Sequence, residues 1–272
     1  MTRSTLRLLL AISLIPLLAF AASHKAKRER VEKELPLPAP IEARVVQVLD
    51  GDTLVLASGE RVRLVDINTP EGPHDGAPAE PFAEEAKQRL KDLALDKTVR
   101  LETSRKERDV YGRRLAHVYA GSTWVNGTLV REGLAVAYTF ADNQMKAPDI
   151  LKAENEARTA QRGLWSHPRW NIKPAAACCT ETEMGRFQLV EGTVVDSGGD
   201  KDHIYLNFGP DYRTDFTIRI ARKDAKKYFL KSGIKDIPAT YVGRTVRVHG
   251  QVVPVYGAMV VVSHPAQVEI LK

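Results

Sequence analysis

The sequence predicts two small β-barrels in tandem, with helices packed on the first barrel, behind a separate N-terminal segment. Two groups of five short strand-like segments, one within residues 41–120 and one within residues 187–263, predict the barrels. Apolar residues at helical spacing, between and after the strands of the first group, predict the helices. A length of 272 residues with a hydrophobic fraction of 43% is enough for two ordinary cores.

Residues 1–22 have the composition of an export signal. Two arginines precede an apolar run, and Ala19-Phe20-Ala21 then supplies small residues at the two positions that a signal peptidase recognises. An uncleaved membrane anchor is the alternative, but the apolar run is short for a membrane span and contains Pro16. We therefore expect a secreted or periplasmic protein, with no stable membrane partner once the signal is cleaved.

Composition divides the remaining chain into four parts. Mixed charge followed by alternating proline in residues 23–40 predicts an extended linker. Residues 41–170 form the first predicted domain, residues 171–185 lack clear periodicity and predict a second linker, and residues 186–272 form the second domain. The net charge of +6 suits a polyanionic partner such as nucleic acid, although ordinary solvation of the surface also accounts for it.

Alternating apolar residues and tight turns define the first barrel. Asp50-Gly51-Asp52 and Ser58-Gly59-Glu60 mark turns between its first three strands. The expected strands are residues 43–49, 53–56, 62–65, 98–102 and 114–119. A helix opens at Pro81, and two more are expected at residues 125–132 and 148–162. A barrel of five such strands with helices packed on it is an OB-type fold.

The second barrel follows the same order with different residues. The expected strands are residues 187–195, 203–208, 214–220, 245–253 and 259–263. A helix expected at residues 221–231, after the third strand, gives the order of an OB-type fold. Basic and aromatic residues in this part suit a surface that binds single-stranded nucleic acid. A solvated basic helix beside core aromatics explains them equally well.

The two cysteines, Cys178 and Cys179, are adjacent in the sequence. Their Cα atoms lie ~3.8 Å apart across a trans peptide bond, whereas disulfides usually need at least ~4.4 Å, so a bridge between them is expected to be strained. Intermolecular pairing and two unpaired thiols both stay open.

Three polar clusters, within residues 50–53, 63–71 and 109–113, interrupt the strands of the first barrel. Each cluster alone is explained as a turn or a surface loop, because Asp-Gly is a common hairpin turn. Together they provide oxygen ligands for a hard divalent cation, namely the side chains of Asp52 and Asn68 and the carbonyl of Thr69.

The same clusters contain groups suited to phosphodiester hydrolysis. Arg63 and Arg113 are permanently cationic, and their planar guanidinium groups match two phosphate oxygens. Glu71 follows the expected metal ligands directly and supplies a carboxylate for an attacking water. The three clusters therefore predict a metal-dependent phosphodiesterase site.

Residues 41–166 resemble the staphylococcal nuclease family. The motifs that carry the resemblance are Leu49-Asp50-Gly51-Asp52-Thr53, Arg63-Leu64, Thr69-Pro70-Glu71, Tyr111-Gly112-Arg113 and Gly163-Leu164-Trp165. Several ordered motifs over about 120 residues are far more specific than one short motif. The resemblance implies an OB-fold nuclease that uses Ca²⁺ to hydrolyse DNA and RNA and leaves 3′-phosphates.

The resemblance also implies roles for individual positions. Asp52 and Asn68 match side-chain calcium ligands, and Thr69 matches a carbonyl ligand. The catalytic positions matched are two phosphate-binding arginines, Arg63 and Arg113, and Glu71, which positions or deprotonates water. Tyr111 and Tyr138 match tyrosines that line the nucleotide site.

Some positions depart from the family pattern. Asn68 stands where the best-known member has an aspartate, so one negative charge is missing and metal affinity is expected to be weaker. Asp66, two residues earlier, could lie on the same face and compensate. Val110 replaces a lysine and Phe140 replaces a tyrosine, which predicts a weaker or altered grip on the nucleotide.

A non-catalytic protein that retains the barrel and binds nucleic acid is the alternative function. Asn68 favours this alternative, because it weakens the expected metal site. Binding alone does not require Arg63, Glu71 and Arg113 together, so their joint presence favours a nuclease that acts on DNA and RNA with little sequence specificity.

Overall fold

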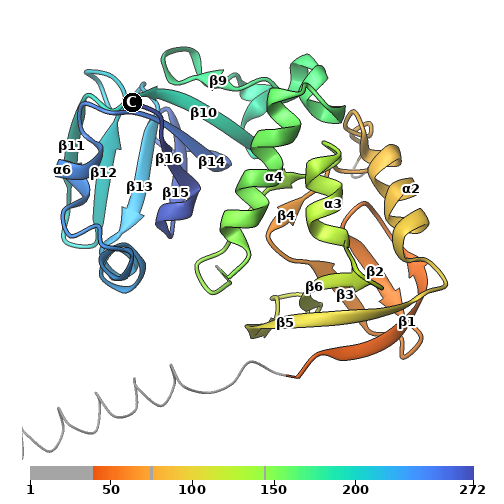
Figure 1. Cartoon of the computed structure of the whole chain (residues 1–272). Coiled ribbons are helices and arrows are strands. Elements are labelled where there is room, and N and C mark those ends of the chain that lie inside the picture. The colour runs from red at the N-terminus through yellow and green to blue at the C-terminus, as the bar shows by residue number, and fades with distance from the viewer. Residues whose placement is uncertain (1–38, 74–75, 144) are drawn as a thin grey trace, which may run out of the picture. The chain divides into compact units, whose positions relative to one another are not determined.

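The computed structural model describes residues 39–73, 76–143 and 145–272 (Figure 1). The export signal and nearly all of the first linker lie outside these residues. Residues 38–272 form one compact unit. In the part of the chain that is described, no helix has both the length and the apolar character needed to cross a membrane.

A closed five-stranded barrel forms the N-terminal part of this unit, as the sequence predicts. Its strands are β1 (Ile41–Val48), β2 (Thr53–Leu56), β3 (Arg61–Leu64), β5 (Thr98–Arg108) and β6 (Arg114–Ala120). β1, β2 and β3 pair in antiparallel order, β5 pairs with β1, and β6 pairs with β5. A parallel pairing of β3 with β6 closes the barrel, which places the end of the β5–β6 loop beside β3.

Short strands that the sequence pattern did not indicate complete this region. They are β4 (Ile67–Asn68), β7 (Thr123–Trp124) and β8 (Val136–Ala137). β7 pairs antiparallel with the end of β6, and β4 pairs with β8 in a two-stranded ladder. That ladder holds Asn68 opposite Val136, two residues before Tyr138.

Apolar side chains at alternate positions along the strands fill the interior of the barrel. Val45, Leu54, Leu64, Leu101 and Val118 are all fully buried in one core cluster. Because side chains alternate between the two faces of a strand, the intervening polar residues face outward or toward the strand ends. Burial of a leucine of this kind contributes roughly 1.5–3 kcal/mol.

Three helices pack on the barrel close to their expected positions. They are α2 (Ala83–Ala94), α3 (Val125–Arg131) and α4 (Ala147–Thr159). α2 begins two residues after Pro81 and buries Ala86, Leu90 and Leu93 along one face, as their helical spacing predicts. Figure 1 shows α3 beside the barrel and α4 between α3 and the second sheet.

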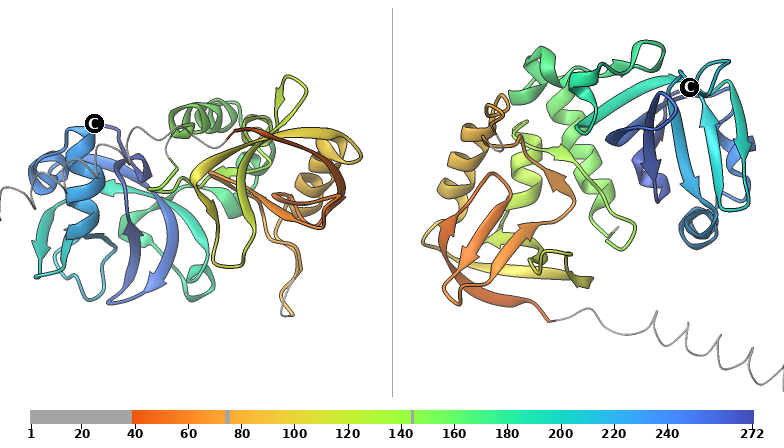
Figure 2. Two further views of the ribbon diagram at one scale, coloured as in Figure 1. Left: turned by 90° about the horizontal axis from the view of Figure 1, so that it is seen from below. Right: turned by 180° about the vertical axis from the view of Figure 1, so that it is seen from behind.

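A second, curled sheet forms the C-terminal part, as a half-barrel (Figure 2). Its strands are β9 (Lys173–Pro174), β10 (Phe187–Thr193), β11 (Asp196–Gly199), β12 (His203–Asn207), β13 (Thr217–Ala221), β14 (Thr245–Pro254), β15 (Ala258–Val262) and β16 (Val268–Ile270). β11, β12 and β13 pair in antiparallel order, β13 pairs in parallel with β15, and β14 joins β15 to β10. This repeats the order of pairings in the first barrel.

Helical residues follow the third strand of the second sheet, where the sequence predicts them. Residues 222–232 are helical and begin with the short helix α5 (Arg222–Asp224). Another short helix, α6 (Ile237–Tyr241), precedes β14 and was not expected. Phe229 and Tyr241 from these segments are buried in the core of the curled sheet.

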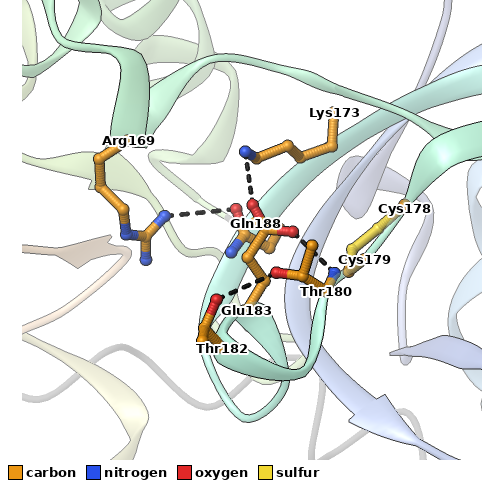
Figure 3. The surroundings of a disulfide bond; sticks show 8 residues. All are labelled: Arg169, Lys173, Cys178, Cys179, Thr180, Thr182, Glu183 and Gln188. Carbon is orange, nitrogen blue, oxygen red and sulfur yellow. Dashed lines mark hydrogen bonds and ion pairs between the residues drawn. A yellow bond between two sulfur atoms is a disulfide. The ribbon is translucent and has the colours of Figure 1, made fainter.

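The segment predicted as a linker, residues 171–185, packs against the second sheet. β9 pairs in parallel with β10, and Ala175 is buried in the core of the sheet. Cys178 and Cys179 are joined by a disulfide, across a cis peptide bond with their Cα atoms 3.0 Å apart (Figure 3). The sequence left the state of the two cysteines open, and in the structure they pair with each other.

Contacts around α4 join the two sheets within the compact unit. Trp165 and Trp170 share a buried apolar cluster with Leu189 from β10. The carboxylate of Glu154 in α4, which is 1% exposed, lies 3.7 Å from His249 Nδ1 in β14 and accepts from the Ala137 N–H at 2.8 Å. A buried carboxylate without such partners is costly, so these contacts stabilise the junction.

Candidate active site

Asp52 is buried at the end of the turn between β1 and β2. Its Oδ1 accepts from the Thr53 hydroxyl at 3.1 Å, and its Oδ2 accepts from the Thr69 N–H at 3.2 Å and hydroxyl at 3.1 Å. Asp50 Oδ1 fixes the turn by accepting from the Asp52 N–H at 3.0 Å. Burial raises the pKa of Asp52, and the charge of Arg63 opposes that rise. The turn therefore brings two predicted metal ligands, Asp52 and Thr69, together.

Arg63 lies in β3 opposite Thr53 in β2. Its Nη2 is 2.9 Å from Asp52 Oδ2 and donates to Asn68 Oδ1 at 3.1 Å, while its Nη1 donates to the Leu64 carbonyl. These contacts fix the guanidinium at the edge of the barrel. Arg63 and two predicted metal ligands consequently form one connected group.

Arg113 lies at the end of the loop between β5 and β6, where the barrel closes. Its Nε donates to Asp109 Oδ2 at 2.7 Å, and its Nη1 donates to the Thr53 hydroxyl at 3.4 Å. Asp109 Oδ1 also accepts the N–H groups of Tyr111 and Arg113, each at 2.9 Å. Because β3 pairs with β6, this loop brings the second arginine to the same threonine that adjoins Arg63.

Glu71 follows β4 and is held through its backbone by Glu80. The Glu71 N–H donates to Glu80 Oε2 at 3.1 Å, and the Glu80 N–H donates to the Glu71 carbonyl at 2.8 Å. Arg169 Nη2 in turn donates to Glu80 Oε1 at 2.9 Å. Desolvation in the cleft, with the negative charges of Asp52 and Asp50, raises the pKa of Glu71, which suits a group that accepts a proton.

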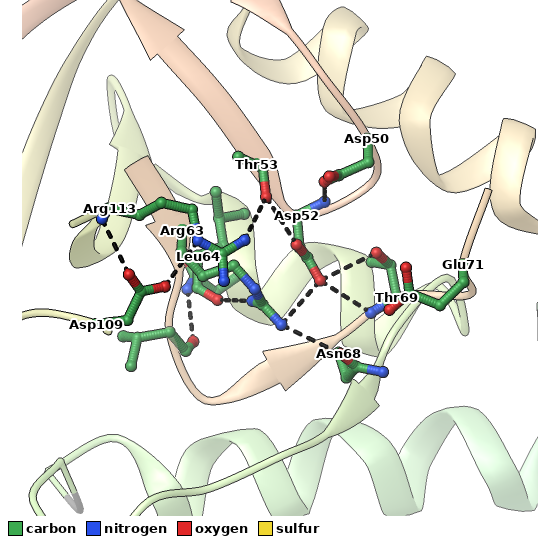
Figure 4. A network of polar contacts seen from close by, with 12 residues as sticks. Asp50, Asp52, Thr53, Arg63, Leu64, Asn68, Thr69, Glu71, Asp109 and Arg113 are labelled. Carbon is green, nitrogen blue, oxygen red and sulfur yellow. Dashed lines mark hydrogen bonds and ion pairs between the residues drawn. The ribbon is translucent and has the colours of Figure 1, made fainter. Parts of the chain in front are cut away.

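The predicted site residues all line one cleft of about 720 Å³. They are Asp52, Arg63, Asn68, Thr69, Glu71, Tyr111, Arg113 and Tyr138. Figure 4 shows Glu71 and Arg113 on opposite sides of Asp52 and Arg63. The fold thus gathers residues from separate strands and loops, while the roles assigned to them stay predictions.

The oxygen atoms around Asp52 suit a hard divalent cation. Arg63 Nη2 lies within 3.1 Å of both Asp52 Oδ2 and Asn68 Oδ1, so the two side-chain oxygens already face one cationic point. In the described ranges, no three His, Cys, Asp or Glu side chains are grouped to hold a metal. The predicted donor set instead combines one carboxylate, one amide and the Thr69 carbonyl, and such an all-oxygen set would fit Ca²⁺ or Mg²⁺ better than a transition metal.

The two predicted nucleotide-binding tyrosines differ in exposure. Tyr111 is 81% exposed, and the Arg113 guanidinium lies 5.5 Å from its ring centroid. Tyr138 is half-buried, with edge-to-face contacts to Phe140 at 4.7 Å and to Phe187 at 5.3 Å between ring centroids. Tyr111 is therefore an exposed ring at the rim, whereas Tyr138 is a ring packed into the wall.

Asp66 does not compensate for the charge missing at Asn68. It is fully buried with a positive φ of 64°, and its Oδ2 accepts from Asn143 Nδ2 at 3.2 Å and lies 3.4 Å from His117 Nε2. The backbone turn at Asp66 breaks the alternation of the strand, so the side chain enters this buried polar cluster. It is not among the residues that line the cleft.

Sequence reasoning missed the supporting carboxylate and arginine behind Glu71. Glu80 and Arg169 are 89 positions apart, and no local pattern links them to each other or to Glu71. Tyr228, one of the C-terminal aromatics expected on a nucleic-acid-binding surface, lines the cleft and donates to Asp142 Oδ1 at 2.6 Å. Other C-terminal aromatics, such as Phe216, are buried in the core of the second sheet.

An OB-type barrel with paired arginines, a carboxylate and oxygens suited to a cation in one cleft is typical of proteins that act on phosphate esters. The family model described as "Staphylococcal nuclease homologue" matches residues 61–167. The chain belongs to the staphylococcal nuclease family, as its similarity to individual relatives also shows.

Two of these relatives are matched over most of their length. The chain is 32% identical to a thermonuclease of Staphylococcus hyicus over 127 residues, covering 46% of this chain and 75% of the relative. It is 38% identical to a micrococcal nuclease of Shigella flexneri over 146 residues, covering 49% and 79%. The SPbeta prophage-derived endonuclease YokF of Bacillus subtilis is 35% identical over 131 residues, covering 46% and 44%.

Proposed function

We propose that this protein is an exported, Ca²⁺-dependent endonuclease that hydrolyses DNA and RNA with little sequence specificity and leaves 3′-phosphates. The single observation that carries the proposal is the joint position of Arg63, Glu71 and Arg113 in one cleft around the Asp52 oxygens. Relatives named as nucleases and endonucleases support the same reaction class.

The residues of the cleft have different roles in the proposed reaction. Asp52, Asn68 and the Thr69 carbonyl would hold the cation, which when bound stabilises negative charge on the phosphate and on the attacking water. Glu71, with its raised pKa, orients a water molecule and accepts its proton. Arg63 binds a phosphate oxygen beside the cation, and Arg113, held by Asp109, stabilises the departing oxygen.

Product analysis tests the proposed reaction. A 5′-labelled single-stranded DNA and its RNA counterpart are incubated with the protein in calcium and, separately, in a chelator. The proposal predicts internal cuts in both substrates only with calcium, and products whose mobility changes after treatment with a 3′-phosphatase. Products with 3′-hydroxyl ends, or cleavage that persists in chelator, would contradict it.

Export is tested on the N-terminus of the protein. The full sequence is expressed in a bacterial host with a periplasm, and the soluble protein is recovered from each compartment. We expect periplasmic or external protein that lacks residues 1–22 when its mass is determined. Full-length protein retained in the membrane fraction would favour the uncleaved anchor.

A further inference from the structure

A second cleft adjoins the candidate active site on the side of Glu71. Its volume is about 260 Å³, compared with about 720 Å³ for the main cleft. Asn68, Glu71, Tyr138 and Gln251 line both clefts, so the two clefts adjoin. The second cleft is therefore within reach of a nucleotide next to a phosphate at the active site.

Aromatic rings form much of this second cleft. Phe187, at the start of β10, meets Tyr138 edge to face at an angle of 77°. Trp170 also lines the cleft, with the Arg169 guanidinium 4.6 Å from its ring centroid. Phe187 comes from the C-terminal part of the chain, beyond residue 167, where the family match ends. A flat, apolar ligand can pack against these rings.

Polar groups in the same walls offer hydrogen bonds. Trp170 Nε1 and Arg169 Nε are buried N–H groups with no acceptor among the described residues. Gln251 is exposed at the boundary between the clefts, and its Nε2 donates to the Gly185 carbonyl at 2.7 Å. Because these two N–H groups are closed off from solvent, the exposed Gln251 amide is the group here that can meet a ligand.

The charges of the second cleft are balanced, which distinguishes it from a phosphate site. Glu80 lies 2.9 Å from Arg169 and 3.7 Å from Arg186, and Glu71 adds another negative charge. A phosphate would meet two carboxylates as well as two guanidinium groups. A neutral, flat ligand with hydrogen-bond acceptors on its edge meets no such repulsion.

We propose that the second cleft binds the base of a nucleotide next to the scissile phosphate. Phe187 and Tyr138 supply the rings, and the exposed Gln251 amide contacts the edge of the base. The inference rests on the proposed nuclease function and adds a subsite contributed by the C-terminal part.

A substrate with one hydrolysable bond tests the subsite in the full-length mature protein. Short single strands carry one phosphodiester among methylphosphonate linkages, and two further versions lack the base on one or the other side of that bond. Removal of the base that occupies the second cleft is expected to raise KM about tenfold, which corresponds to the loss of one base–aromatic contact. Phe187→Ala is expected to raise KM for the complete substrate similarly and to abolish the difference between substrates.

Two further variants control for folding and general effects. Gln251→Ala alters an exposed side chain and is expected to reduce the penalty for the missing base at least twofold, even if Phe187→Ala folds poorly. Tyr212→Ala removes a 52% exposed ring that lines neither cleft. The rise in KM caused by the missing base should therefore be the same in this variant as in the wild type.

The outcomes separate the subsite from the nuclease function. Cleavage by the wild type with equal KM for all three substrates would overturn the subsite and leave the nuclease intact. A penalty that stays unchanged in both Phe187→Ala and Gln251→Ala would also overturn it. Failure of the wild type to cleave any of the substrates would refute the proposed function, and the subsite with it.

Discussion

At the scale of the residue, Asp109 determines where Arg113 points, through its contacts with the Arg113 Nε and two N–H groups. Asp109→Asn keeps one acceptor but removes the charge, so the guanidinium loses its orientation. We expect kcat to fall about tenfold, since small displacements of a catalytic group are costly. Steady-state hydrolysis of single-stranded DNA measures this change in kcat. The matched control, Asp96→Asn, removes an exposed pair with Arg44, and an equal loss in both variants would contradict this role.

Asn68 is one of the residues that we propose hold the cation, and it carries no charge where a carboxylate would add one. Its Oδ1 and Asp52 Oδ2 both contact Arg63 Nη2, so the two oxygens face the same point. Asn68→Asp adds one negative charge at this predicted ligand position. We expect the calcium dissociation constant, measured by calorimetry without substrate, to decrease about tenfold. A constant that is unchanged or larger would mean that Asn68 does not contact the cation.

At the scale of the element, Glu60 connects the β2–β3 turn to β6 across the closure of the barrel. Its Oε2 accepts from Arg114 Nε at 3.0 Å, and its Oε1 accepts from Arg108. The hydrogen bond from Arg114, aided by that from Arg108, holds the pKa of Glu60 below its ordinary value of 4.5. Its contribution to stability is therefore complete above pH 4.5 and is lost as the pH falls through the lowered folded-state pKa.

Glu60→Gln tests this connection. At pH 7 the variant should lose about 0.5–1 kcal/mol of unfolding free energy, because the ion pairs are partly exposed. The difference from the wild type should shrink toward zero as the pH falls below 4.5. Urea titrations over a pH series measure it, and a difference independent of pH would contradict the assigned cause.

Gly133 permits the close approach of the segments that follow α3 and α4. Its φ is +72°, and a Cβ there would lie 2.2 Å from the Arg162 carbonyl oxygen. Gly133→Ala should therefore cost about 2–4 kcal/mol, from strain in the backbone and from the clash. Gly59→Ala is the matched control, because its φ is +82° with no atom within 4 Å. Urea midpoints should show a loss of only about 1 kcal/mol there, and equal losses would rule out the clash.

At the scale of the whole molecule, the sequence predicts the parts that depend on local pattern. Alternation and turn residues predict the strands of both sheets, and helical spacing predicts α2, α3 and α4. The Arg63–Asp52–Asn68 group follows from matched motifs, because the pairing of β2 with β3 places Arg63 beside the Asp52 turn. The pairing of Glu80 with Arg169 depends on tertiary packing, and the direction of the Asp66 side chain depends on its positive φ. No local sequence pattern predicts either feature.

The joint action of cation, carboxylate and arginines is the central claim at this scale. Single-stranded DNA hydrolysis by the mature protein at stepped calcium concentrations, beside Glu71→Ala and Arg113→Ala, tests it most directly. We predict chelator-sensitive cleavage that saturates with calcium and falls about 10²–10³-fold in the variants. No cleavage at any calcium concentration, with nucleic-acid binding intact, would contradict it and identify a barrel that binds nucleic acid without cutting it.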